Sequence, residues 1–250
     1  MRGSRPGSSI LSDGRDSGRK TFRSLVGGTS VSSDKSRKPF LTTLYTQYLD
    51  DQDSAGFISK VSQFYLPGTL QRLVEGDNRE VRRAAVLALG FIGDYSANHA
   101  MGRALLDDDR TVRMLAESGI RSLWARAGNE QERQELGIIM RLNAAQQYKE
   151  ALARASELVE KAPWFAEVWN QRAVARFNMG QFAESIRDCH QALEINPYHF
   201  AAAASMGQSY LELGNPISAL EAFRRALRLN PDLEGIRVQV VRLARMVEDK

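Results

Sequence analysis

The sequence has little of the chemistry on which many enzymes and extracellular domains depend. Cys189 is the single cysteine among 250 residues, so no disulfide can form within the chain. The three histidines, His99, His190 and His199, show no metal-ligand spacing to one another. The sequence contains neither a glycine-rich phosphate-binding motif nor a nucleophile elbow. We therefore predict a protein that is not an enzyme and that has no metal site and no other cofactor.

Long apolar runs are absent as well. The longest candidate, AAVLALGFIG at residues 84–93, is about half of the roughly 18–20 apolar residues that a membrane-spanning helix requires. The N-terminal region also lacks the apolar segment of a secretory signal. We expect no membrane insertion and a cytoplasmic location.

Residues 1–38 differ in composition from the rest of the chain. They hold ten serines, six glycines, nine basic and three acidic residues, a net charge of +6 that leaves −2 of the total +4 for residues 39–250. Because so few apolar side chains cannot offset the entropy of ordering, the segment is predicted to be a disordered tail. Import into an organelle and association with nucleic acid are alternatives, although the absence of interleaved aromatic residues does not favour nucleic acid.

The C-terminal half contains a repeat. The segment ALEINPYHF at residues 192–200 recurs 34 positions later as ALRLNPDLE at residues 226–234, and the same step relates Gly180 to Gly214. Within each unit the apolar residues recur at helical spacing, with glycine after one helix and Asn-Pro after the next. Each unit is therefore predicted to be a pair of helices that buries its apolar faces by stacking on its neighbours.

These residues resemble the tetratricopeptide repeat pattern of 34 residues. The resemblance is strongest in two units, 166–199 and 200–233, in which the matching residues are Trp169, Ala173, Gly180, Ala192 and Pro197, and Gly207, Tyr210, Gly214, Ala219, Phe223, Ala226 and Pro231. The first unit departs from the pattern at Arg172, Arg176, Ser185 and Cys189. Residues 132–165 are similar to a degenerate unit, and residues 235–248 are predicted to form a capping helix. We expect Ala173 and Gly207 to lie where helices cross, and Trp169 and Phe223 to be buried.

A second period occupies the middle of the chain. The segment GDNREVRRAAVLALG at residues 76–90 resembles DDDRTVRMLAESGIR at residues 107–121, and Asp77 and Asp109 stand where each could cap the helix that follows. The pattern is similar to HEAT-like repeats, which also occur in bilin-lyase-type proteins. Residues 40–49 and 54–65 are predicted to be helices of a further degenerate unit.

The predicted fold class is all-α: a right-handed α-solenoid of stacked helical hairpins, with HEAT-like repeats followed by tetratricopeptide repeats. The predicted domains are the tail at 1–38, the HEAT-like repeats at 39–128, and the tetratricopeptide repeats with their cap at 129–250.

The resemblance implies a protein-binding surface on the first helix of each repeat, along side chains three and four positions apart. The predicted peptide-contacting residues are Glu167, Asn170, Val174, Phe177, Asn178, Ala201, Ala204, Gln208, Leu211 and Glu212. A subclass of the family grips a C-terminal carboxylate with Lys and Asn on this face. Those side chains are absent here, because Asn170, Val174, Ala204 and Gln208 stand at the corresponding positions.

We therefore predict a non-catalytic scaffold or adaptor that binds a protein or peptide segment in the concave groove. The amide and apolar side chains do not favour nucleic acid or a small molecule as the partner. Two alternatives are an accessory or lyase-like role in bilin-type cofactor attachment, by analogy of the HEAT-like region, and nucleic-acid association through the tail.

Overall fold

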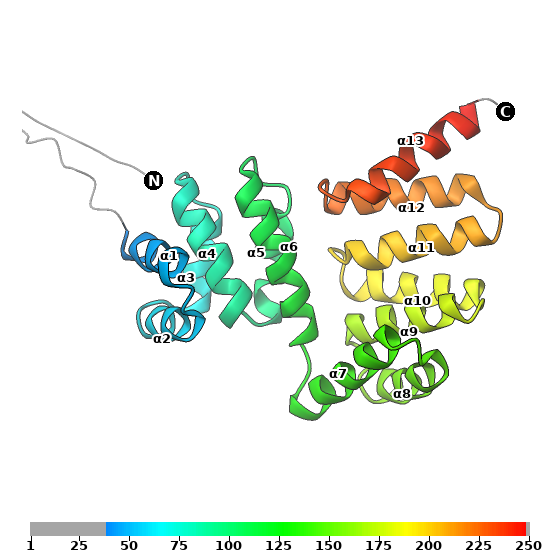
Figure 1. Cartoon of the computed structure of the whole chain (residues 1–250), viewed down its shortest axis with the longest axis horizontal. Coiled ribbons are helices and arrows are strands. Elements are labelled where there is room, and N and C mark those ends of the chain that lie inside the picture. The colour runs from blue at the N-terminus through cyan, green and yellow to red at the C-terminus, as the bar shows by residue number, and fades with distance from the viewer. Residues whose placement is uncertain (1–38, 249–250) are drawn as a thin grey trace, which may run out of the picture. The chain divides into compact units, whose positions relative to one another are not determined.

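The computed structural model describes residues 39–248, and within that range every regular element is a helix (Figure 1). The tail at residues 1–38 lies outside the described residues, so its predicted disorder is not addressed. The predicted all-α class of stacked helical hairpins is confirmed. The elements are α1 (Phe40–Asp51), α2 (Ser54–Phe64), α3 (Pro67–Val74), α4 (Arg79–Ile92), the 3-10 helix η1 (Tyr95–Ala97), α5 (Asn98–Ala104), α6 (Arg110–Ala125), α7 (Glu130–Ala144), α8 (Tyr148–Lys161), α9 (Ala166–Asn178), α10 (Phe182–Ile195), α11 (Phe200–Glu212), α12 (Pro216–Leu229) and α13 (Glu234–Glu248).

From α8 onward the helices keep the interval found in the sequence. The helices α9, α11 and α13 begin at residues 166, 200 and 234, and α8, α10 and α12 begin at residues 148, 182 and 216. Each helix from α7 to α13 contacts the next one along the chain, and Figure 1 shows α9 to α13 stacked in successive layers. We call α7, α9, α11 and α13 first helices, because each opens a unit of the repeat.

The turn after each first helix uses the same backbone geometry. Gly180 and Gly214 adopt left-handed φ angles of 75° and 70°, and the residue one step earlier, Gln146, adopts 61°. In each turn the next residue's N–H donates back to a carbonyl five positions earlier, at 2.8–2.9 Å. This closure satisfies the last carbonyls of the helix. The side chain of Gln146 makes this turn less favourable, because a Cβ atom disfavours a left-handed φ angle.

The departures of the first unit from the repeat pattern compensate one another. Arg172 and Arg176 both pair with Asp188 of α10 at 2.8 Å, and the Asp188 side chain is only 2% exposed. Arg172 also stacks over the ring of Trp169, 4.7 Å from its centroid. A buried carboxylate needs such partners, since an unpaired charge in the interior is costly. An ion cluster therefore replaces the apolar contacts that Leu and Tyr make in the family pattern.

Small side chains permit close packing elsewhere in the stack. Gly207 lies against the ring of Phe223, and a Cβ at Gly207 would come within 2.5 Å of that ring. Ala173 and Phe223 are fully buried. Trp169 was expected to be buried but is half-buried, because its indole Nε1 donates to the Pro163 carbonyl at the surface, 2.8 Å away.

The N-terminal helices pack around a further hydrophobic cluster, which Phe200 of α11 also joins, and within it α4 and α6 make the most extensive contact. Their backbones meet at Gly90 and Gly119, where a Cβ on Gly90 would lie 3.1 Å from the Cα of Gly119. One of the two predicted helix caps is confirmed, because the Asp109 side chain accepts from the Val112 N–H at 3.0 Å. The other is wrong: Asn78 caps α4 in place of Asp77, because its side chain reaches the N–H groups of Glu80 and Val81.

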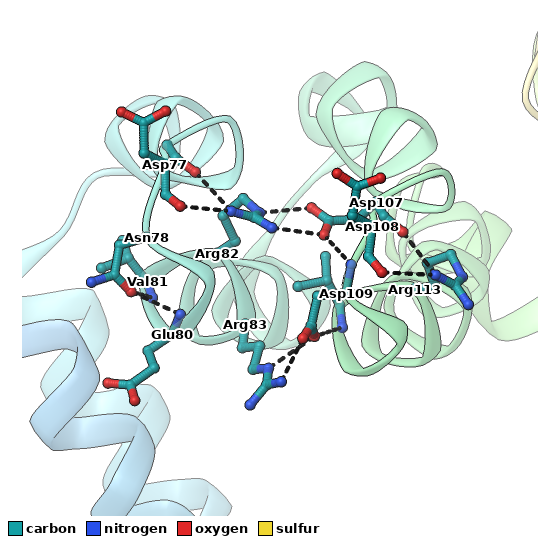
Figure 2. A network of polar contacts seen from close by, with 12 residues as sticks. Asp77, Asn78, Glu80, Val81, Arg82, Arg83, Asp107, Asp108, Asp109 and Arg113 are labelled. Carbon is teal, nitrogen blue, oxygen red and sulfur yellow. Dashed lines mark hydrogen bonds and ion pairs between the residues drawn. The ribbon is translucent and has the colours of Figure 1, made fainter.

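A polar ladder joins the loops before α4 and α6 (Figure 2). Arg82 of α4 donates to the carbonyls of Gly76 and Asp77 in the loop before that helix. It also forms a two-pronged ion pair with Asp107, at 2.7 and 2.9 Å. Arg83 pairs in the same way with Asp109. The sequence motif Val-Arg thus supplies the arginine that fastens one unit to the next.

Arg113 lies 31 residues after Arg82 and repeats part of this pattern. From α6 it donates to the carbonyls of Asp107 and Asp108 in the loop before that helix (Figure 2). Its guanidinium also binds Asp232, in the loop between α12 and α13. The ladder therefore runs from the N-terminal helices into the C-terminal repeats.

Candidate functional site

The candidate site is the stripe of side chains along the first helices α9 and α11, which contact each other. The structure separates its members by burial. Asn178, Gln208 and Glu212 are exposed, Val174, Phe177, Ala201, Ala204 and Leu211 are half-buried, and Glu167 and Asn170 are buried.

Glu167 is used inside the protein. Its Oε2 accepts from Nε2 of His199 at 2.9 Å, and its Oε1 accepts from the side-chain amide of Gln171 at 2.7 Å. Nδ1 of His199 accepts from the Ala202 N–H, so the proton lies on Nε2. Burial alone would raise the pKa of the Glu167 carboxyl, but the hydrogen bonds from His199 and two amide side chains lower that pKa overall. The Glu167 carboxylate is thus buried and hydrogen-bonded to side chains of the protein itself.

Asn170 was expected to face outward and is instead 5% exposed. Its Nδ2 donates to Oε1 of Glu167 at 3.2 Å, while its Oδ1 has no hydrogen-bond partner within the described residues. The expected exposure of Asn170 is therefore wrong, and Glu167 of the same stripe is buried as well. The reason is tertiary: α6, α7 and α11 all contact α9.

Side chains from α6 cover this end of the stripe. The ring of Trp124 stacks on His199, with centroids 4.3 Å apart and an interplanar angle of 18°. Trp124 Nε1 donates to Asn98, whose amide in turn donates to Asn196 in the loop before α11. Arg121 lies over the ring of Phe200, 4.6 Å from its centroid. No spacing in the sequence signals the contacts of α6 with His199 and Phe200, because these residues lie 75 or more positions further along the chain.

The other end of the stripe remains accessible. Phe177 packs its ring edge-to-face against Phe182, with centroids 5.5 Å apart, and keeps one side half-exposed. Leu211 packs against the cluster that joins α12 to α13. Gln208 is exposed and makes no side-chain hydrogen bond within residues 39–248. The accessible face therefore offers apolar surface and an uncommitted amide.

Reactive groups are sparse in the part of the chain that the structure describes. Burial, with a smaller contribution from Asp188, raises the pKa of the Cys189 thiol to about 12, which makes it a poor nucleophile. Among residues 39–248, no three His, Cys, Asp or Glu side chains gather as metal ligands would. Over the same residues, no helix is both long and apolar enough to span a bilayer.

Comparison with protein families agrees with this architecture. Residues 166–199 and residues 200–233 each match the Tetratricopeptide repeat family, and residues 66–157 match HEAT repeats. The chain contains both HEAT and tetratricopeptide repeats. The HEAT match runs past α6 and includes α7 and most of α8, beyond the predicted end of that region.

The relatives align with only part of this chain. A TPR repeat-containing protein of Rhizobium etli is 35% identical over 94 residues, which are 38% of this chain and 46% of that protein. The Hsp70-Hsp90 organizing protein of Triticum aestivum is 24% identical over 94 residues, 38% of this chain and 16% of that protein. The chain thus spans less than half the length of these two relatives.

Among solved structures, the first TPR domain of Spaghetti (RPAP3) bound to an HSP90 peptide aligns with a TM-score of 0.46. It is 18% identical and covers 48% of this chain and 96% of that one. The TPR2AB domain of yeast Sti1, in complex with HSP90, aligns with a TM-score of 0.43 at 18% identity and covers 82% of this chain and 84% of that one.

Proposed function

We propose that this protein is a non-catalytic scaffold that binds a segment of another protein on the accessible part of its first helices. The observation that carries the proposal is the stripe formed by Val174, Phe177, Gln208 and Leu211 on α9 and α11. The binding surface that we propose consists of these residues with Asn178, Ala204 and Glu212, and leaves out Glu167 and Asn170, which are buried.

Burial and hydrogen bonding support this assignment. The buried core of the repeats consists of other side chains, such as Ala192, Ala203 and Phe223, and Ala204 and Leu211 pack only at its edge. Gln208 adds nothing to that core and has no side-chain hydrogen bond of its own within the described residues. An amide beside apolar groups suits the backbone and side chains of an extended or helical peptide.

The relatives add support of a general kind. One of them is an Hsp70-Hsp90 organizing protein, and that name is consistent with a scaffold role for the shared repeats. The cytoplasmic location stays a prediction, as does the absence of catalysis.

A peptide-display experiment tests the proposal. The full chain is immobilised and used to select from a library of random 12-residue peptides, and selected peptides are then measured by fluorescence anisotropy against variants. Val174→Arg places a cation against apolar surface and Gln208→Ala removes the amide, so each should weaken binding by about tenfold, roughly 1.4 kcal/mol.

The matched control is Arg228→Ala, an exposed residue on the second helix α12, which should leave affinity unchanged. Circular dichroism melting of each variant separates lost binding from lost folding. If peptides selected by the wild-type chain bind Val174→Arg and Gln208→Ala with unchanged affinity, the proposed surface is not the binding site.

A further inference from the structure

The last helix carries the stripe one repeat further and changes its chemistry. Advancing Ala204, Gln208, Leu211 and Glu212 by 34 residues gives Val238, Arg242, Arg245 and Met246 on α13. The correspondence is structural as well, because α11 and α13 begin one step apart. The positions that offer amide and apolar groups on α9 and α11 therefore present two arginines on α13.

One side of α13 is anchored. Leu243 is buried against the α12 side chains Ala219, Leu220 and Phe223, and Ile236, Val240, Ala244 and Val247 pack around the same cluster. These residues are spaced three and four apart, as one face of a helix requires. The orientation of α13 is thereby set, and its opposite face points away from the repeats.

That opposite face is apolar and cationic. Val238, Val241 and Met246 are 65%, 49% and 46% exposed on α13, the last helix that the structure describes. Val241 stands one 34-residue step after Gly207 and two steps after Ala173, the positions where a second helix crosses, and on α13 no described helix covers it.

The two arginines of this face are unpaired in the part of the chain that the structure describes. Arg242 and Arg245 are exposed, and neither forms an ion pair or side-chain hydrogen bond within residues 39–248. By contrast, Arg237 at the start of α13 is bonded to the Pro231 carbonyl. The outer face of α13 therefore presents two uncompensated positive charges among three exposed apolar side chains.

We propose that the outer face of α13, formed by Val238, Val241, Arg242, Arg245 and Met246, binds an acidic segment of a partner protein that also carries apolar side chains. The proposal rests on the proposed function and names the chemistry of the partner. Acidic side chains pair with the two guanidiniums, while apolar side chains cover the valines and the methionine.

The positive charge of the outer face of α13 favours an acidic partner over the tail of the same chain and over a second copy of it. The tail of the same chain has a net charge of +6 and is repelled by the arginines. A second copy docking through the same face by two-fold symmetry would bring arginine toward arginine. An acidic partner satisfies both the charge and the exposed apolar groups.

The same display selection tests the proposal through the amino-acid composition of the selected peptides. Peptides selected by the full wild-type chain should be enriched in Asp and Glu beside apolar residues. Selection on the double variant Arg242→Glu and Arg245→Glu should shift the enrichment to Lys and Arg. The matched control, Arg224→Glu and Arg228→Glu, reverses two exposed arginines on α12 that have no ion pair within residues 39–248, and it should keep the acidic enrichment.

Selected peptides are then synthesised with an amidated C-terminus. They should bind the wild-type chain as tightly as the free acids and lose at least tenfold in affinity on the Arg242 and Arg245 double variant. A requirement for the free carboxylate would overturn the proposal, because the ligand would then be a chain terminus and not an internal acidic segment.

Other outcomes also decide the matter. Absence of acidic enrichment, or enrichment that the Arg242 and Arg245 reversal leaves unchanged, overturns the proposal. So does a wild-type dimer in sedimentation velocity that Val238→Glu dissociates, since the face would then be a self-interface. Loss of binding in Val174→Arg with no effect at α13 keeps the proposed function and removes this inference. The reverse pattern keeps the α13 surface and removes the groove.

Discussion

Arg113 of α6 and Asp232, in the loop before α13, form a two-pronged ion pair in which Nε lies 2.8 Å from Oδ2 and Nη2 lies 3.3 Å from Oδ1. Arg82 binds Asp107 in the same way within the N-terminal helices. Asp232, from the tetratricopeptide part, thus stands in for the aspartate of a further HEAT unit. The ion pair between Arg113 and Asp232 therefore links the HEAT helices to the tetratricopeptide repeats.

The ion pair between Arg113 and Asp232 should stabilise the folded chain. Both side chains are less than one third exposed, so Arg113→Met or Asp232→Asn should each lower the free energy of unfolding by about 1–3 kcal/mol. The double variant should cost less than the sum, because the two residues share one interaction. Urea unfolding measures all three. Arg103→Met, which breaks an exposed pair with Glu75, is the control and should cost under about 1 kcal/mol. Additive losses would show that the pair is not coupled.

Gln146 offers a stabilising change. It holds a left-handed conformation that glycine holds at the equivalent positions 180 and 214. Gln146→Gly removes the Cβ conflict and, after the entropy that glycine adds to the unfolded chain, should raise the free energy of unfolding by about 0.5–1 kcal/mol. Gly180→Ala should lower it by about 1 kcal/mol for the opposite reason. Thermal melting of the two variants tests the predicted gain in stability for Gln146→Gly and the predicted loss for Gly180→Ala. A lower melting point for Gln146→Gly would contradict the argument.

The ion cluster around Asp188 should be sensitive to partial removal. Asp188→Ala leaves Arg172 and Arg176 without their shared carboxylate and should cost about 3–5 kcal/mol. Replacing all three as Arg172→Leu, Arg176→Tyr and Asp188→Ala restores the apolar residues of the repeat pattern at the two arginine positions and should recover most of that loss. Chemical denaturation compares the two variants. Equal stability of the single and triple variants would mean that the charges do not act as a unit.

Stability should fall in acid through Asp107 and Asp109. The Arg83 hydrogen bond, opposed by burial, holds the pKa of Asp109 well below its usual range. For Asp107, burial raises the pKa, but Arg82 and the Asp109 backbone N–H lower it overall. Because both folded pKa values are depressed, their stabilisation is fully present above about pH 4 and is lost as pH falls through the folded values.

Urea unfolding between pH 7 and pH 2 measures this loss. In Arg83→Met the pKa of Asp109 should return toward its usual value, so the variant should lose less stability than the wild type across the acid range. A wild-type chain whose free energy of unfolding is constant from pH 5 to pH 2 would contradict the assignment.

The sequence by itself determined the order and register of the repeat helices α9 to α12. Helical periodicity, glycine after one helix and Asn-Pro after the next are local signals, so α9 to α12 begin where the 34-residue step requires. The same locality explains the confirmed cap at Asp109. The crossing at Gly207 is also readable from the repeat, because the pattern demands a small residue there.

Only the tertiary structure decided which members of the stripe are accessible. Helical spacing placed Glu167 and Asn170 on the same face as Val174, but spacing cannot tell what lies over that face. Trp124 stacks on His199 from 75 residues away, and Arg113 reaches Asp232 from 119 residues away. Such contacts depend on how separate helices pack, and side-chain burial is a property of the whole packed chain and not of a local pattern.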